Sequence, residues 1–257
     1  VDVYDDKITA YLTKLSSENL SYKDSLQVTS LLHCITDFER ISDHSINVVE
    51  SVQQMRKENL TFSRKGEEEM NLYGAAIRDI LTRTTDAFVN NDQALAHTVE
   101  PLEEVIDELN KDVKKHHMKR LRKGKCSMEL GLILSDLAMN YERVADHCSN
   151  IAVYMMQLKD TQLEEHSFTE QLDEAESAEF TRLLDEFGSP YVKSAIRMHR
   201  DQKLRVSVKL SSNNNFLLIS TGKISNLFIH IRRFYIVHFH DIFIVTLYFF
   251  RIQKSMA

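Results

Sequence analysis

The chain has little glycine and proline and no tryptophan: its 257 residues include six Gly, two Pro and no Trp. Sandwiches, barrels and doubly wound sheets need many tight turns, which are built mainly from Gly, Pro, Asn, Asp and Ser. The scarcity therefore argues against those folds and favours long helices with few loops. Hydrophobic residues make up 43% and charged residues 27%, a composition typical of folded amphipathic helices rather than of a disordered chain.

Signals for secretion and membrane insertion are also missing. The three cysteines (Cys34, Cys126 and Cys148) are odd in number and lack metal-finger spacing, which favours reduced thiols in a cytoplasmic protein. No signal peptide is recognised at the start of the sequence. The most apolar stretch, residues 227–250, is interrupted by two Arg, three His and an Asp, so the sequence predicts no membrane-spanning helix.

The charge is unevenly distributed along the chain. The net charge is -6, but residues 201–257 contain eight Lys/Arg, two Asp and no Glu, so residues 1–200 are strongly acidic. An acidic body excludes nucleic acid as a partner and favours a cation. The basic tail, residues 201–257, is of uncertain origin: it is either an aromatic segment that touches a membrane surface or non-native coding sequence.

Apolar residues recur with a helical period over most of the first 160 residues. The pattern predicts helices over residues 1–15, 25–57, 67–89, 92–119 and 127–158. Ser63 is expected to cap the third helix, and Pro101 to lie early in the fourth helix or to kink it. An acidic helical extension is expected over residues 161–200, with an interruption at 188–190.

An internal repeat is the strongest feature of the sequence. Residues 37–47 and 140–150 share five of eleven positions at an offset of 103 residues, which is the length of a three-helix unit. The preceding helices repeat more weakly, at an offset of 105. The sequence thus predicts an all-α chain with a partial first repeat over residues 1–60, which lacks its opening helix, and a second repeat over residues 61–160.

The repeated motif places carboxylates one helical turn apart. Glu39, Asp43 and Asn47 form one polar strip, as do their counterparts Glu142, Asp146 and Asn150, and the helix before the second motif carries Glu103 and Asp107. Converging carboxylates on facing helices typically bind a hard cation. The alternative is a set of exposed acids paired with Lys or Arg.

The other side chains of the motif leave two readings open. His44 and His147 either hydrogen-bond within the bundle or ligate metal, and Arg40 and Arg143 are expected to neutralise neighbouring carboxylates. No glycine-rich phosphate loop, nucleophile elbow or Cys-x-x-Cys pair is present, which argues against an enzyme. A two-metal phosphoesterase built from the same carboxylates is kept as an alternative.

The hexapeptides Glu-Arg-Ile-Ser-Asp-His and Glu-Arg-Val-Ala-Asp-His, one near the end of each repeat, resemble the signature of the PhoU family. Residues 120–126, with 140–152, look like its sodium/phosphate cotransporter branch, in which a PhoU-like domain forms the cytoplasmic C-terminus. The resemblance covers about residues 1–195. It implies two three-helix bundles and metal ions bound by the acid pairs, which carry over to Glu103, Asp107, Glu142, Asp146, Asp2, Glu39 and Asp43.

The resemblance implies a non-enzymatic regulatory domain of a sodium-dependent phosphate transporter, cytoplasmic and at the inner face of the cell membrane. Its cofactor would be Fe, Zn, Mn or Mg. Its partners would be a membrane domain missing from this chain and phosphate-signalling proteins; a free-standing PhoU-type regulator is the alternative. The missing helix predicts an exposed apolar groove beside Ile35, Phe38 and Val49, and hence self-association.

Overall fold

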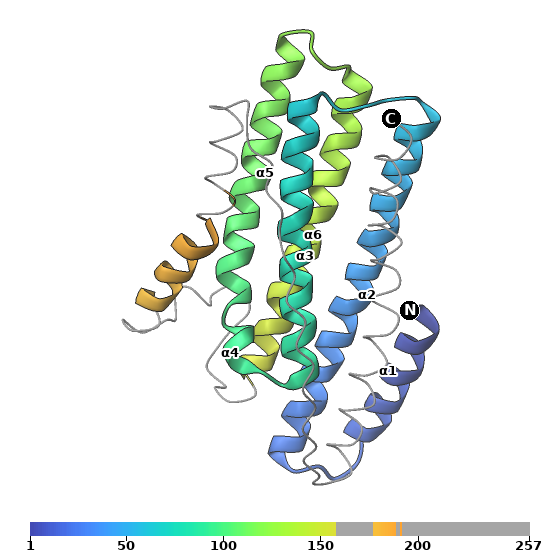
Figure 1. Cartoon of the computed structure of the whole chain (residues 1–257). Coiled ribbons are helices and arrows are strands. Elements are labelled where there is room, and N and C mark those ends of the chain that lie inside the picture. The colour runs from blue at the N-terminus through green and yellow to red at the C-terminus, as the bar shows by residue number, and fades with distance from the viewer. Residues whose placement is uncertain (158–176, 189–190, 192–257) are drawn as a thin grey trace.

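The computed structural model describes residues 1–157, 177–188 and 191, and this part of the chain is helical without any strand (Figure 1). The all-α prediction is therefore confirmed. The helices are α1 (Asp2–Ser16), α2 (Tyr22–Lys57), α3 (Arg64–Asn90), α4 (Gln93–Ala96), α5 (Val99–Arg122) and α6 (Met128–Gln157), and residues 177–188 are helical as well.

Side-chain caps explain where several helices begin. Ser21 accepts a hydrogen bond from the backbone N–H of Asp24 at the start of α2, and Ser63 accepts one from Gly66 at the start of α3. The single helix predicted over residues 92–119 is wrong, because the chain breaks after α4 and resumes at Val99. Pro101 lies in the first turn of α5, where backbone N–H groups have no acceptor within the helix, so the N–H that proline lacks costs no hydrogen bond.

Helix α6 is the centre of the molecule. It packs against α2, α3, α4 and α5, while α1 packs on α2 (Figure 1). Helices α3, α5 and α6 form a three-helix bundle, and α1 with α2 correspond to α5 with α6 of that bundle. The two helices that carry the repeated motif, α2 and α6, therefore lie against each other.

The groove predicted beside α2 is wrong at two of its three residues. Ile35 and Phe38 are 0% and 2% exposed, because α2 packs against α6 and the Phe38 ring meets the edge of Phe88 on α3 at 5.0 Å. The large hydrophobic side chains that are exposed on α1 and α2 are instead Val3, Tyr4, Tyr11, Tyr22 and Ile46. Self-association stays a prediction.

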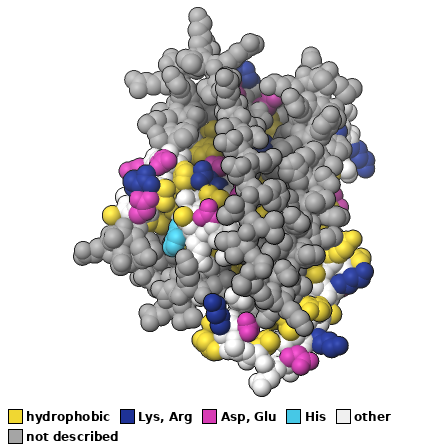
Figure 2. Space-filling view, turned by 60° about the horizontal axis from the view of Figure 1, so that its bottom comes forward, with side chains coloured by type: hydrophobic (Ala, Val, Ile, Leu, Met, Phe, Trp, Pro, Cys, Tyr) yellow, Lys and Arg dark blue, Asp and Glu magenta, His cyan; other side chains and the backbone are white. Residues whose placement is uncertain are grey.

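Residues 177–188 return to the bundle, and Leu183 and Phe187 join its core. The rest of the predicted extension and the tail over 201–257 lie outside the described residues. None of the described helices is long and apolar enough to span a bilayer. Seen from the end that carries α4, basic, acidic and hydrophobic side chains are interspersed over the described surface (Figure 2).

Candidate functional site

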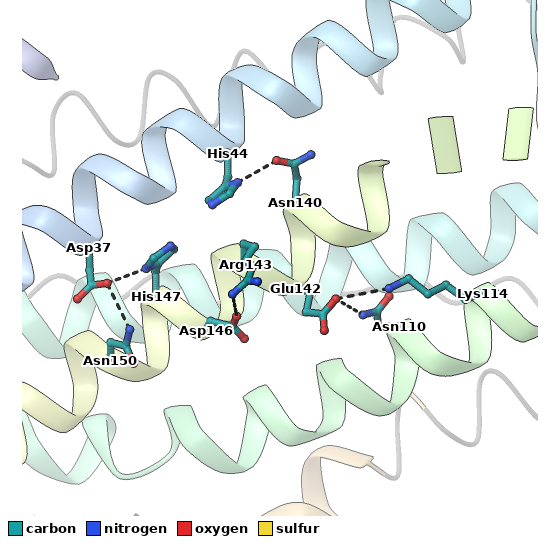
Figure 3. Close-up of polar contacts among 10 residues, drawn as sticks. All are labelled: Asp37, His44, Asn110, Lys114, Asn140, Glu142, Arg143, Asp146, His147 and Asn150. Atoms are coloured by element: carbon teal, nitrogen blue, oxygen red, sulfur yellow. Dashed lines mark hydrogen bonds and ion pairs between the residues drawn. The ribbon is translucent and has the colours of Figure 1, made fainter. Parts of the chain in front are cut away.

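The two motif helices meet through their histidines. The rings of His44 and His147 stack with centroids 5.6 Å apart. His147 Nδ1 lies 2.7 Å from Asp37 Oδ1 on α2, and His44 Nδ1 lies 2.9 Å from Asn140 Oδ1 on α6 (Figure 3). Both acceptors are buried. Of the two readings for these histidines, the structure shows hydrogen bonding within the bundle.

Each acceptor takes a second bond from the opposite repeat. Asn150 Nδ2 donates to Asp37 Oδ1 at 3.4 Å, and Asn47 Nδ2 donates to Asn140 Oδ1 at 3.1 Å. Asp37 and Asn140 occupy the same repeat position, 103 residues apart, so the contact has approximate two-fold symmetry. We call it the inter-repeat contact; its residues are Asp37, His44, Asn47, Asn140, His147 and Asn150. The side chains of Asn47 and Asn150, which were predicted to extend the polar strips, thus belong to this contact instead.

On the other side of α6, two acids point toward α5. Glu142 Oε2 accepts hydrogen bonds from Asn110 Nδ2 at 2.6 Å and from Lys114 Nζ at 3.5 Å. Asp146 Oδ2 lies 3.4 Å from Arg143 Nη1 (Figure 3). The predicted role of Arg143 as a neutralising partner is confirmed, and so is that of Arg40, whose Nε lies 3.6 Å from Glu39.

The four acids predicted for the second repeat, Glu103, Asp107, Glu142 and Asp146, are electrostatically coupled, and we call them the carboxylate cluster. Burial raises the pKa of Glu103 to about 9, with smaller contributions from Glu100, Asp107 and Asp146. The pKa of Asp107 is raised as well, mainly by burial and to a lesser extent by the negative charges of Glu142 and Asp146. Such mutual repulsion in a partly buried site is relieved by a proton or by a cation.

An orphaned oxygen lies beside the carboxylate cluster. Asn110, 3% exposed, donates to Glu142, but its own Oδ1 is buried and accepts no hydrogen bond from any residue that the structure describes. In the described part of the chain, no three His, Cys, Asp or Glu side chains are placed to hold one metal ion. Asn110 and Lys114 occupy the Glu142 oxygen, and Arg143 lies against Asp146. The oxygen donors fit a hard cation chemically, provided that these partners give way.

The first repeat holds a weaker version of this cluster. The pKa of Glu39 is raised mainly by burial, then by the negative charge of Asp43, with a smaller contribution from Asp5. The predicted Asp2 lies in the first turn of α1. Burial raises the pKa of Asp5, and the negative charge of Asp2 contributes to this increase. Asp5 was missed by the sequence analysis. Asp5 and Asn110 lie 105 residues apart, the offset already seen between the helices that precede the two motifs. Applying that offset to every polar residue of these helices would have identified Asp5 and Asn110 as a pair.

Comparison with known proteins identifies the family of the chain. The PhoU domain model matches residues 1–52 and 70–155, more than half of the chain, so the chain belongs to the PhoU family. The chain is 31% identical over 124 residues to phosphate-specific transport system accessory protein PhoU homolog 1 of Thermotoga maritima, covering 48% of this chain and 53% of the relative. The chain thus spans about half the length of that relative. No solved structure matches the chain.

Proposed function

We propose that this chain is a non-enzymatic, metal-binding regulator of phosphate uptake, acting in the cytoplasm beside a membrane transporter. Membership of the PhoU family supports the regulatory role, and the name of the Thermotoga relative, an accessory protein of a phosphate-specific transport system, supports the process. The observation that carries the metal part of the proposal is the carboxylate cluster, in which burial and mutual repulsion raise the pKa values of Glu103 and Asp107.

Two transporter contexts fit this role. In the first, the chain regulates a sodium-dependent phosphate transporter whose membrane domain is the partner. In the second, it is a free-standing accessory protein that contacts phosphate-signalling proteins, which the name of the relative favours. Reintroducing the chain into bacteria that lack their own PhoU protein separates them: a free-standing regulator restores control of phosphate uptake on its own, whereas a transporter domain does so only when joined to its membrane partner.

The cation would be held by Glu103, Asp107, Glu142 and Asp146, with Asn110 Oδ1 as a neutral oxygen nearby. When bound, it would supply the positive charge that offsets the repulsion among these acids and so stabilise the folded state. Oxygen ligands suit Mg²⁺, Mn²⁺, Fe or Zn²⁺ with different geometries. A second, weaker site would involve Asp2, Glu39 and Asp43, with Asp5 beside them.

The metal proposal is tested on the purified chain loaded with Mn²⁺ or Fe and freed of excess ion. We expect elemental analysis to find bound metal and the melting temperature to rise. Glu142→Gln with Asp146→Asn should abolish both effects. The matched control, Glu108→Gln with Asp112→Asn, removes two charges from an exposed part of α5 and should leave both unchanged. The proposal would be contradicted if the unmutated chain contained no bound metal and its melting temperature did not change when a chelator was added.

A phosphoesterase built on the same cluster would also bind two cations, which suit phosphoester cleavage when they lie about 3.5–4 Å apart. The two functions differ in turnover. For the metal-loaded chain we expect no hydrolysis of p-nitrophenyl phosphate above that of the Glu142→Gln, Asp146→Asn variant. Metal-dependent turnover that this variant loses would replace the regulatory proposal with the enzymatic one.

A further inference from the structure

The turn between α5 and α6 is a basic surface on an acidic protein. Residues 111–125 contain eight Lys/Arg and one acidic residue, whereas the whole chain has a net charge of -6. Lys119, Arg122, Lys123 and Lys125 are exposed, and none of the four makes an ion pair with another described residue. The turn lies at the opposite end of the bundle from α4 (Figure 1). In the part of the chain that the structure describes, these four charges are therefore not neutralised by an acidic side chain.

Exposed apolar side chains lie beside these cations. Met118 is 48% exposed, Met128 64% and Leu132 67%. The helices face each other at His117 and Gly131, because a Cβ built on Gly131 would lie 2.9 Å from His117 Nε2. In an antiparallel pair, the next residue on each helix turns by about 100° to the same side. Met118 and Leu132 therefore point to one side of the hairpin, and Met128, one turn before Leu132, joins them.

We propose that this surface docks the protein on a membrane containing anionic phospholipids. We call it the hairpin tip; its residues are Met118, Met128 and Leu132 with Lys119, Arg122, Lys123 and Lys125. Lysine and arginine side chains are attracted to acidic headgroups, and unbranched or aliphatic side chains enter the interface below them. Basic and apolar contributions together give stronger membrane binding than either alone.

The shape of the hairpin tip favours lipid over a protein partner. A stable protein interface typically buries about 800 Å² on each side. The hairpin tip is a narrow turn with three apolar side chains at the end of two helices. Acidic residues bound it on α6, at Glu129 in the first turn and again at Asp136. A fluid lipid surface needs no such area and accepts a convex tip. The proposal goes beyond regulation of phosphate uptake and does not depend on metal.

The first experiment measures co-sedimentation of the full chain with vesicles of phosphatidylcholine, with or without about one third phosphatidylglycerol. We expect binding only to the anionic vesicles and weaker binding at high salt. Lys123→Gln with Lys125→Gln should weaken binding about thirtyfold. The matched control is Lys14→Gln with Lys23→Gln at the equivalent hairpin between α1 and α2, which should bind like the unmutated chain. Equal loss in both pairs, or no vesicle binding, would overturn the proposal.

The second experiment locates the contact and uses the absence of Trp from the chain. In Leu132→Trp the new indole reports only on the hairpin tip, and in Ile46→Trp it reports on a comparably exposed position of α2. Anionic vesicles should shift the Leu132→Trp emission to the blue and make it quenchable by brominated lipid, without affecting Ile46→Trp. If the chain sediments with vesicles but Leu132→Trp emission does not change, another segment, such as residues 201–257, makes the contact.

Discussion

Two glycines inside long helices have opposite surroundings. A Cβ at Gly131 on α6 would meet the buried His117 ring at 2.9 Å, whereas at Gly74 on α3 the nearest atom, the Tyr141 hydroxyl, is 3.7 Å away. Alanine in a helix interior gains about 0.5–1 kcal/mol over glycine when space permits. Overpacking a core costs about 1–3 kcal/mol. Gly131 therefore permits the close approach of α5 and α6.

We accordingly expect Gly74→Ala to stabilise the chain by about 0.5–1 kcal/mol. Gly131→Ala should destabilise it by about 1 kcal/mol, because the clash outweighs the gain in helix propensity. Urea denaturation of both variants measures the two free energies of unfolding. If Gly131→Ala proves as stabilising as Gly74→Ala, α5 and α6 are packed less closely there than the structure shows.

Glu103 makes the metal-free protein sensitive to pH. Burial, then Glu100 and Asp107, raise its pKa from 4.5 to about 9. The folded chain therefore keeps a proton that the unfolded chain releases, so this contribution to stability is complete below about pH 4.5 and is lost as the pH rises toward about 9. Glu103→Gln is neutral throughout. We expect it to flatten the fall in unfolding free energy across this range, while the exposed Glu108→Gln keeps the slope of the unmutated chain.

At the scale of helices, the inter-repeat contact joins α2 to α6 by hydrogen bonds. Asp37→Ala removes the acceptor of both His147 and Asn150 and leaves two partly buried donors unpaired. Each unpaired group costs about 1–3 kcal/mol, so we expect a loss of about 2 kcal/mol or more in unfolding free energy. Asp37→Asn keeps an oxygen acceptor, as Asn140 does in the other repeat, and should cost less. Equal losses for the two substitutions would show that the hydrogen bonds contribute little.

Much of the helical framework could be predicted from the sequence. The scarcity of Gly and Pro identified long helices, and Ser63 marked the start of α3. The acid spacing indicated which residues of α5 and α6 interact through their charges, namely Glu103, Asp107, Glu142 and Asp146. These features depend on local chemistry and on the period of one helix, which a sequence displays directly. Asp92 was predicted as a helix cap, and it begins α4. The break before α5 was missed because the apolar period continues from Ala96 to Val99 and Thr98 makes no side-chain cap hydrogen bond.

The partners across helices could not be predicted in the same way. Asp37 and Asn140 differ in type, so a search for identical residues passed over them although they occupy equivalent positions. Lys114 and Asn110 reach Glu142 from α5, and their roles depend on the rotation of that helix about its axis. Ile35 and Phe38 were expected beside an exposed groove because the first repeat lacks its opening helix. They are buried instead, because α2 packs against α6, a tertiary contact that the period of one helix does not display.

For the whole molecule, the proposed cation and the protons of the carboxylate cluster compete for the same oxygens. With a pKa of about 9, Glu103 carries a proton at neutral pH in the metal-free fold, and it must lose that proton before it ligates a metal. Metal binding should therefore release protons, and the affinity should increase with pH. The stabilisation that excess cation provides should increase in parallel, since it depends on the ratio of metal concentration to dissociation constant.

We thus expect Mn²⁺ to raise the melting temperature more at about pH 8 than at about pH 6, whereas the contribution of Glu103 to the stability of the metal-free chain decreases over this range. Calorimetric titration in buffers of different ionisation enthalpy measures the protons released. In Glu103→Gln, which has no proton to lose at this position, both the pH dependence and the proton release should diminish. A stabilisation that is independent of pH in the unmutated chain would place the cation away from Glu103, because binding at this partly buried carboxyl requires its ionisation.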